Sequence, residues 1–232
     1  MEGLRVVGDP RVLSRLYYEQ GADELIYIDT VASLYGRDII ENIVKLAAQE
    51  IFIPLTVGGG IRTVEDAKRM LLAGADKVAV NSGAIRNPSL LTDIAKIFGN
   101  QCVVVSIEAK KTSTDKWEAY IDNGREPSGL DVLEWAKLSV ELGAGEVLLT
   151  SVDRDGTKKG LDIALISALS ESVSIPVIAS GGVGDANHVV EAFVHSEVDG
   201  IAMASVLHSK KFTISGIKQF CKDSGIAVRI TE

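Results

Sequence analysis

The chain has 232 residues, of which 46% are hydrophobic, so it is long enough to bury a large core as one α/β barrel or as two smaller domains. Its formal net charge of −8 argues against a nucleic-acid groove or an anionic membrane surface as a partner. Phosphate ligands remain compatible with this charge, because backbone N–H groups bind them without net positive charge.

Short apolar runs alternate along the chain with longer helical patterns. The first helix is predicted to begin at Asp9-Pro10, an N-cap followed by proline, and Asn87-Pro88 repeats this device. Thr63 to Asp66 resembles a capping box. The apolar runs are continuous, which is typical of parallel strands buried on both faces. These predicted strands are Leu25–Ile28, Ile53–Val57, Lys77–Val80, Cys102–Ile107, Glu146–Val152, Ile175–Ala179 and Gly200–Ala204. A long segment after the fourth strand predicts a hairpin, with a strand at Trp117–Ile121 and a turn at Asp122–Gly124.

An internal repeat determines the predicted fold. The segment Ile53-Pro-Leu-Thr-Val-Gly-Gly-Gly-Ile61 matches Ile175-Pro-Val-Ile-Ala-Ser-Gly-Gly-Val183 at an offset of 122 (175 minus 53). Gly21-Ala-Asp-Glu24 and Gly143-Ala-Gly-Glu146 match at the same offset. We therefore predict one (β/α)₈ (TIM) barrel domain over 1–232, built from half-barrels of about 1–100 and 101–232.

The same repeat leaves the Cys102–Ile107 strand without a partner, because its counterpart would precede Met1. We therefore expect the first barrel strand to be missing, which leaves seven parallel strands. The alternative is a seven-stranded fold in its own right. The missing strand is expected to leave an opening between the Leu25–Ile28 strand and the Gly200–Ala204 strand.

Two glycine-rich loops, each between a strand and a helix, predict phosphate binding, because glycine lets the backbone approach a ligand closely. We define the first phosphate cup as Gly58 to Gly60 with Asn81 and Ser82. The second phosphate cup is Ser180 to Gly182 with Ala204 and Ser205. The alternative is that these glycines serve only tight turns. Two repeat-related cups at one barrel mouth favour a substrate with a phosphate at each end.

Carboxylates at strand ends are candidates for acid and base chemistry between the cups. Glu108 follows the fourth strand, Asp153 and Asp155 follow the fifth, and Asp29 follows the first. A carboxylate at such a position faces the barrel mouth and can transfer protons if its pKa is tuned. The alternative for each is a solvated loop acid or a helix cap.

Charged residues also occur at the opposite ends of the strands. Glu24, Lys77 and Glu146, the floor trio, lie at strand starts and are predicted to ring the barrel floor as an ion-paired gate or as ordinary salt bridges. Two cysteines without a CxxC or Cys/His cluster predict no metal site, and no cofactor is expected. The sequence shows no signal peptide and no apolar run of about 18 residues, which predicts a cytoplasmic protein.

Four segments together resemble the cyclase subunit of imidazole glycerol phosphate synthase, and the resemblance runs from about Glu2 to Arg229. They are Phe52-Ile-Pro-Leu-Thr-Val-Gly-Gly-Gly-Ile-Arg62, Gly74-Ala-Asp-Lys-Val78, Leu148-Leu-Thr-Ser-Val-Asp-Arg-Asp-Gly-Thr157 and Ile175-Pro-Val-Ile-Ala-Ser-Gly-Gly182. The resemblance implies a lyase of histidine biosynthesis that takes ammonia from a partner glutaminase. It implies a bis-phosphorylated formimino-carboxamide ribulotide as substrate, and imidazole glycerol phosphate and aminoimidazole carboxamide ribotide as products.

The resemblance also implies roles for individual residues. It places one phosphate on Gly60, Asn81 and Ser82, and the other on Asp155, Gly156, Gly182, Ala204 and Ser205. It makes the floor trio the ammonia gate, facing a glutaminase that docks at the N-terminal face of the barrel.

Two departures from the family pattern concern its catalytic aspartates. The first would precede Met1, and the second falls at Glu108, whose side chain is one methylene longer. A shift of about 1 Å can cost on the order of 100-fold in rate, so these departures predict a poor cyclase. Three alternatives stay open: an amidotransfer partner for surface-sugar biosynthesis, a catalytically silent phosphate-binding barrel, and the sister aminoaldose isomerase, which needs no ammonia gate.

Overall fold

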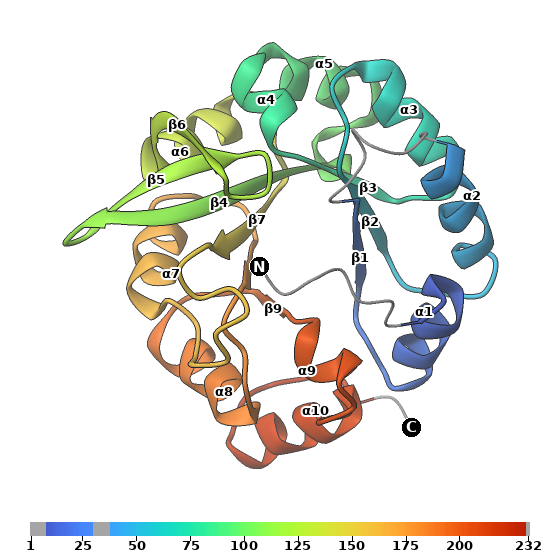
Figure 1. Ribbon diagram of the computed structural model, residues 1–232, viewed down its shortest axis with the longest axis vertical. Coiled ribbons are helices and arrows are strands. Elements are labelled where there is room, and N and C mark those ends of the chain that lie inside the picture. The colour runs from blue at the N-terminus through green and yellow to red at the C-terminus, as the bar shows by residue number, and fades with distance from the viewer. Residues whose placement is uncertain (1–7, 30–37, 231–232) are drawn as a thin grey trace.

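Seven parallel strands curl into a barrel-like sheet, and the helices pack around its outside (Figure 1). The computed structural model describes residues 8–29 and 38–230. The parallel strands follow the order β1-β2-β3-β4-β7-β8-β9, and two further strands, β5 and β6, extend the sheet from β4 with antiparallel pairing. The (β/α)-barrel with seven parallel strands that the repeat predicts is therefore confirmed.

The strands are β1 (Leu25–Ile28), β2 (Leu55–Gly58), β3 (Lys77–Val80), β4 (Val103–Ser113), β5 (Lys116–Ile121), β6 (Glu126–Asp131), β7 (Glu146–Ser151), β8 (Val177–Ser180) and β9 (Gly200–Ala202). The helices are α1 (Pro10–Glu19), α2 (Asp38–Ala47), α3 (Val64–Leu72), α4 (Ser82–Arg86), α5 (Ser89–Phe98), α6 (Val132–Glu141), α7 (Ile163–Ser170), α8 (Ala186–His195), α9 (Ser205–His208) and α10 (Ile214–Asp223), with a 3₁₀ turn, η1, at Asn100–Cys102. Cys102 belongs to this turn, so the strand predicted to start there begins one residue later.

Side-chain oxygens start the helices largely as their sequences predict. Asp9 accepts a hydrogen bond from the Arg11 amide and precedes Pro10, and Thr63 forms a capping box with Asp66. The prediction for Asn87 is wrong. α5 begins at Ser89 without a side-chain cap, and the Asn87 side chain accepts a hydrogen bond from the Ser89 hydroxyl instead of a helical amide.

Alternate positions on each strand separate the barrel interior from the core beneath the helices. A small inner cluster contains Ala79, Val104 and Leu148, with Ile26, Ile178 and Ala202 packed against it. The neighbouring positions, such as Val103, Val105 and Val147, join the large core between sheet and helices. Because side chains alternate along a strand, Lys77 and Glu146 share the inner face with Ala79 and Leu148, and Glu108 shares it with Val104.

The sequence repeat is also visible in equivalent hydrogen bonds. Asp76 Oδ2 accepts a bond of 2.8 Å from the Leu55 amide, and Asp199 Oδ2 accepts one of 2.8 Å from the Val177 amide. In return, the Asp76 amide donates to Leu55 O and the Asp199 amide to Val177 O. The two halves of the sheet therefore fix the same strand starts with the same pair of contacts.

Within the described residues no strand lies between β9 and β1, which confirms the predicted opening. Helices of the outer layer bridge this seam. Tyr17 Oη on α1 lies 2.7 Å from His208 Nδ1 on α9, and Lys218 Nζ on α10 lies 2.7 Å from Asp23 Oδ1, just after α1. The outer layer therefore closes between α1 and α10 where the sheet does not.

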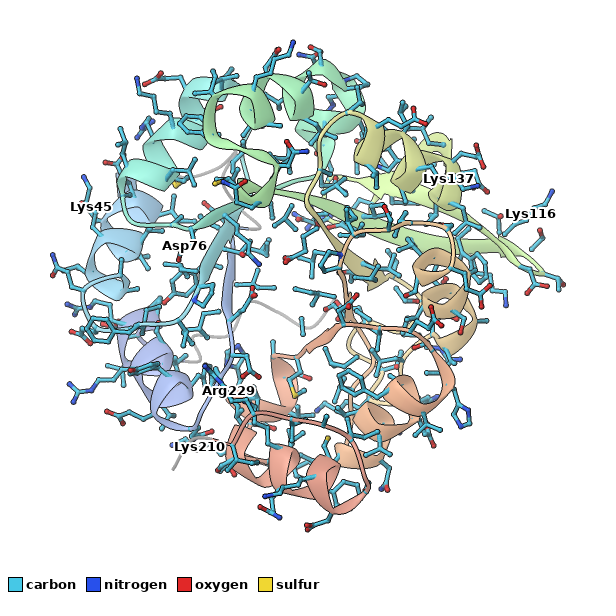
Figure 2. The ribbon with its side chains drawn as sticks, turned by 180° about the vertical axis from the view of Figure 1, so that it is seen from behind. Lys45, Asp76, Lys116, Lys137, Lys210 and Arg229 are labelled. Atoms are coloured by element: carbon cyan, nitrogen blue, oxygen red, sulfur yellow. The ribbon has the colours of Figure 1, made fainter. Side chains whose placement is uncertain are left out.

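The hairpin after the fourth strand is confirmed and is larger than predicted. The Asp122–Gly124 turn joins β5 to β6 as expected, but β4 itself continues to Ser113 and pairs with β5 through a second turn. In Figure 2, Lys116 lies at the tip of this projection, beyond the ring of helices. The extension brings the Asp122–Gly124 turn back over the barrel mouth.

Candidate functional site

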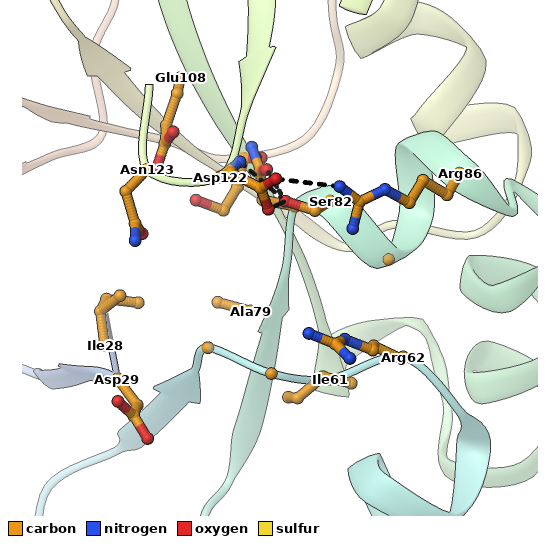
Figure 3. Close-up of a pocket in the computed structure, with 15 residues that line it drawn as sticks. Ile28, Asp29, Ile61, Arg62, Ala79, Ser82, Arg86, Glu108, Asp122 and Asn123 are labelled. Carbon is orange, nitrogen blue, oxygen red and sulfur yellow. Dashed lines mark hydrogen bonds and ion pairs between the residues drawn. The ribbon is translucent and has the colours of Figure 1, made fainter. Parts of the chain in front are cut away.

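A cavity of about 110 Å³ opens at the C-terminal ends of the first strands (Figure 3). Its walls come from the loops after β1, β2 and β3, the inner face of β4, and the turn between β5 and β6. It is lined by Ile28, Asp29, Gly59, Gly60, Ile61, Arg62, Ala79, Asn81, Ser82, Gly83, Arg86, Ser106, Glu108, Asp122 and Asn123. The structure thus brings Glu108 into one cavity with all residues of the first phosphate cup except Gly58, which belongs to β2.

Two of the three glycines of this cup have backbone conformations that other residues rarely adopt. Gly59 and Gly60 have φ angles of +93° and +70°. A Cβ atom at Gly59 would also lie 2.2 Å from the carbonyl oxygen of Asp29. The repeat-related loop behaves in the same way, because Gly182 has φ +102° and its Cβ would lie 2.2 Å from Gly160 O. Both loops therefore bring bare backbone close to the barrel mouth.

Asn81 and Ser82 connect the cup to the hairpin. The Asn81 side-chain amide donates to Ser106 O at 3.0 Å and to Tyr120 O at 3.1 Å, which ties β4 and β5 to the cup. The Ser82 hydroxyl accepts a 3.0 Å hydrogen bond from the Asp122 amide and lies 3.4 Å from Asp122 Oδ1. Ser82 therefore already contacts a carboxylate in this structure.

Among the carboxyl groups that line the cavity, Glu108 has the most strongly shifted pKa. Burial raises the pKa of its side chain to about 7, and the charges of Asp122 and Asp155 add to the effect while the Gly124 amide opposes it. Its Oε2 atom is buried and has no hydrogen-bond partner among the described residues. A buried carboxyl group with a pKa near neutrality can give or take a proton at physiological pH.

This pKa predicts that Glu108 destabilises the fold at high pH. The folded protein holds the proton more tightly than the unfolded chain, so stability falls as pH rises from about 4.5 to about 7. Glu108→Gln should remove this loss of stability, because glutamine does not ionise. At pH 8 it should raise the free energy of unfolding by about 1 to 3 kcal/mol, a range reduced for partial exposure.

Urea unfolding of parent and variant at pH 8 and at pH 4.5 measures this difference. The gain should nearly disappear at pH 4.5, where Glu108 is protonated in the folded protein and about half protonated in the unfolded chain. Glu191→Gln, on the exposed surface of α8, is the control and should change stability little at either pH. An equal gain at both pH values would show that Glu108 is ionised normally.

The residues of the second phosphate cup lie across the barrel mouth from the first, on the loops after β8 and β9 (Figure 1). Gly182 O accepts a 2.8 Å hydrogen bond from the Gly160 amide, which ties the loop after β8 to the loop after β7. The loop after β7 also carries Asp155 and Gly156. Asp155, Ala204 and Ser205 are exposed, and none of the five residues assigned to this phosphate lines the cavity described above.

The other candidate acids have different surroundings. Asp153 Oδ2 accepts a 2.7 Å hydrogen bond from the Lys111 amide, so this carboxylate fixes the start of the hairpin against the loop after β7. Asp29 lines the cavity opposite Glu108 (Figure 3). Of the acids predicted at strand ends, Glu108 and Asp29 thus reach the cavity.

The floor trio meets at the opposite ends of the same strands. Lys77 Nζ lies 3.0 Å from Glu24 Oε2 and 2.6 Å from Glu146 Oε2. Burial alone would lower the pKa of Lys77, but its hydrogen bonds to Glu146 and Glu24 outweigh burial and raise it. Only 10% of the Glu146 side chain is exposed, so this charge depends on Lys77 for compensation.

Three charged residues of the cavity lining were not singled out from the sequence as ligands or acids: Arg62, Arg86 and Asp122. The sequence positions of the two arginines could have identified them as candidate ligands. Arg62 follows the glycine run directly, and Arg86 lies four residues after Ser82, on the same face of a helix. Asp122 gives no such signal, because it reaches the cavity only through the folding-back of the hairpin.

No group of three or more His, Cys, Asp or Glu side chains in residues 8–29 and 38–230 is arranged to hold a metal ion. Across those same ranges, every helix is too short or too polar to cross a membrane.

Most of the chain is similar to known proteins of histidine biosynthesis. A family model described as histidine biosynthesis protein matches residues 1–213. Three relatives are each named imidazole glycerol phosphate synthase subunit HisF. The protein from Methanocaldococcus jannaschii is 48% identical, over 98% of this chain and 90% of its own length. The protein from Legionella pneumophila is 60% identical over 79% and 87%, and that from Bacillus cereus is 49% identical over 98% and 90%.

Proposed function

Because this chain belongs to the histidine biosynthesis protein family, we propose that it is the cyclase subunit of an imidazole glycerol phosphate synthase. The enzyme is a lyase that uses ammonia to convert the bis-phosphorylated formimino-carboxamide ribulotide into imidazole glycerol phosphate and aminoimidazole carboxamide ribotide. One observation carries the proposal: a carboxyl group with a pKa near 7 faces a glycine-lined cup at the barrel mouth.

The proposed roles combine the resemblance to the family with the positions of the residues. The first phosphate cup, with Gly60, Asn81 and Ser82, holds one phosphate of the substrate, and Asp155, Gly156, Gly182, Ala204 and Ser205 surround the other. The substrate then spans the mouth, with its reacting centre near Glu108. Glu108 transfers a proton to or from that centre, and Asp155 adds to the negative field that keeps Glu108 protonatable.

Ammonia is proposed to enter at the opposite end, past the floor trio. Between the floor trio and the mouth, the barrel interior contains the apolar inner cluster, which suits neutral ammonia better than ammonium. The relatives are named as subunits, and we propose a glutaminase as the partner of this chain, docked at the N-terminal face.

Exposed apolar side chains on that face support the docking proposal. Phe52, just before β2, is 80% exposed, and Leu72, at the end of α3, is 77% exposed. Ile97, near the end of α5, is also exposed. The ends of these helices lead into the starts of the strands, where the floor trio lies. Exposed apolar groups clustered on one face are typical of protein interfaces.

The alternatives raised by the sequence are not favoured, since all three relatives carry the synthase name. The direct test incubates the purified chain with the bis-phosphate substrate and ammonium chloride, and separates the two products by chromatography. A second assay replaces ammonium with glutamine and the glutaminase subunit of a relative. Formation of both products supports the proposal. The sister activity would instead be identified if the purified chain converted the aminoaldose isomer of this substrate into the ribulotide without cleavage.

The two cups make a matched prediction for substrate binding. Ser82→Asp and Ser205→Asp each place a carboxylate at equivalent positions of the repeat, so each should weaken binding of the bis-phosphate by about 10-fold or more through charge repulsion. Isothermal titration calorimetry measures the effect, and Ser209→Asp, just beyond α9, is the control. Unchanged affinity in both cup variants would contradict the two-phosphate assignment.

A further inference from the structure

Three side chains meet at the first phosphate cup: Ser82, Arg86 and Asp122. Asp122 contacts both other residues, with its Oδ1 3.4 Å from the Ser82 hydroxyl and its Oδ2 3.0 Å from the Arg86 guanidinium (Figure 3). The Ser82 hydroxyl also donates to Asn81 Oδ1 at 3.0 Å. The Asp122 amide also donates to Ser82 Oγ at 3.0 Å. Ser82 and Arg86 come from α4, whereas Asp122 comes from the turn between β5 and β6.

The carboxylate of Asp122 contacts the groups that a phosphate would need. A serine hydroxyl and an arginine guanidinium are both common phosphate ligands, and guanidinium binds phosphate in paired hydrogen bonds. Here each of the two faces one oxygen of the Asp122 carboxylate. A phosphate dianion and this carboxylate cannot share them without strong repulsion between like charges.

The pair between Arg86 and Asp122 is also weak enough to exchange. About half of each side chain is exposed, 51% for Arg86 and 44% for Asp122. Exposed ion pairs of this kind contribute little to stability, so an incoming anion of higher charge can replace the carboxylate.

Strain in the turn adds to this argument. Asp122 and Asn123 both have positive φ angles, +50° and +58°, in a turn that ends with Gly124. Residues other than glycine adopt such angles at some cost, although Asp and Asn tolerate them best. A turn held partly by contacts with Ser82 and Arg86 can therefore rearrange when those contacts are lost.

We propose that Asp122 competes with the substrate's phosphate for Ser82 and Arg86, and that Arg86 becomes a ligand of this phosphate once the carboxylate is displaced. This inference rests on the proposed function, which puts a phosphate monoester in the cavity. Asp122 and Arg86 then set the affinity of the first cup, and Arg86 offsets the negative charge that Asp29, Asp122 and Glu108 bring to its lining.

The test measures binding of inorganic phosphate and of the bis-phosphate substrate by calorimetry at fixed ionic strength. Asp122→Asn keeps the size of the side chain and its tolerance of positive φ, and it should tighten binding by about 3- to 10-fold. Arg86→Gln should weaken binding by a similar factor. In the Arg86→Gln background, Asp122→Asn should have less than about half of its effect on a logarithmic scale, because the competition for Arg86 is gone.

Asp115→Asn is the matched control, since Asp115 also has a positive φ angle, +53°, in the other turn of the hairpin. It should leave phosphate affinity unchanged. Weaker binding in Asp122→Asn, or equal effects of this substitution with and without Arg86, would overturn the inference. If Ser82→Asp abolishes binding while Asp122→Asn and Arg86→Gln do not alter it, the cup exists without the competition. If none of the three alters it, the proposed phosphate site itself is wrong.

Discussion

Replacing Glu108 by glutamine is expected to lower ammonia-dependent turnover by about 10² to 10⁴-fold, the range that a proton-transferring side chain supplies. The reason is that glutamine keeps the shape of the side chain but neither gives nor takes a proton at this pH. The affinity for the bis-phosphate substrate should stay within a few-fold, because the phosphates are held by the two cups. Steady-state kinetics and calorimetry on the same variant separate the two effects.

The pH dependence provides the control for this assignment. The kcat/KM profile of the parent should bend near pH 7, the pKa of Glu108 in the free protein. A limb that rises with pH identifies a general base, and a limb that falls identifies a general acid. Glu108→Gln should remove that limb, whereas Glu108→Asp should keep it. A higher rate in Glu108→Asp would show that the longer arm of glutamate slows the reaction.

A Glu108→Gln variant that turns over at the parental rate would eliminate the catalytic role. The stability difference between pH 8 and pH 4.5 would remain a separate measure of the same carboxyl group.

Replacing Lys77 by methionine is expected to lower the free energy of unfolding by about 2 to 4 kcal/mol. The substitution keeps the apolar stem but leaves the buried Glu146 carboxylate without its 2.6 Å partner. Turnover with glutamine and the glutaminase should change more than turnover with free ammonia, because only the former requires passage through the floor. Denaturant unfolding and the ratio of the two rates measure these effects.

Lys137→Met is the matched control, since Lys137 pairs with Glu134 at 3.2 Å on the exposed surface of α6. It should cost at most about 0.5 kcal/mol. Lys77→Arg, which keeps the charge, should be milder than Lys77→Met in both measurements. A Lys77→Met protein as stable as Lys137→Met would mean that the floor trio is well hydrated. If the ratio of the glutamine-dependent rate to the ammonia-dependent rate did not change, the floor trio would have no role in ammonia passage.

The order and type of the barrel strands could be predicted because local signals agreed with one another. The apolar runs, the caps at Asp9 and Thr63, and the repeat at an offset of 122 all point to βα units. Boundaries were less certain where capping was ambiguous. At Asn87-Pro88 the side chain bonds to the Ser89 hydroxyl, so the helix starts later than its sequence suggests.

The site could be predicted only in part, because local sequence patterns do not show which distant segments come into contact. Gly60, Asn81, Ser82 and Glu108 follow directly from strand ends, and the structure places them in one cavity. The Asp122 carboxylate enters the same cavity from 40 residues beyond Ser82, through a hairpin whose full length the sequence did not reveal. Similarly, the bond between Tyr17 and His208 spans 191 residues.

The seam between β9 and β1 leaves these two strands at the edges of the sheet, where they have fewer hydrogen-bonded neighbours than the central strands. The amides of Leu25 and Asp29 donate to the loop before β2 and to Gly58, so those of Ile26 and Ile28 point toward the seam. Strands β4 and β7 instead have hydrogen-bonded neighbours on both sides. Among the amides of the parallel strands, hydrogen exchange should therefore be fastest at Ile26 and Ile28 and slowest near Val105 and Val147, because local opening begins where the fewest hydrogen bonds must break. Cooperative unfolding of this barrel then proceeds from the seam toward β4 and β7, the last strands to separate.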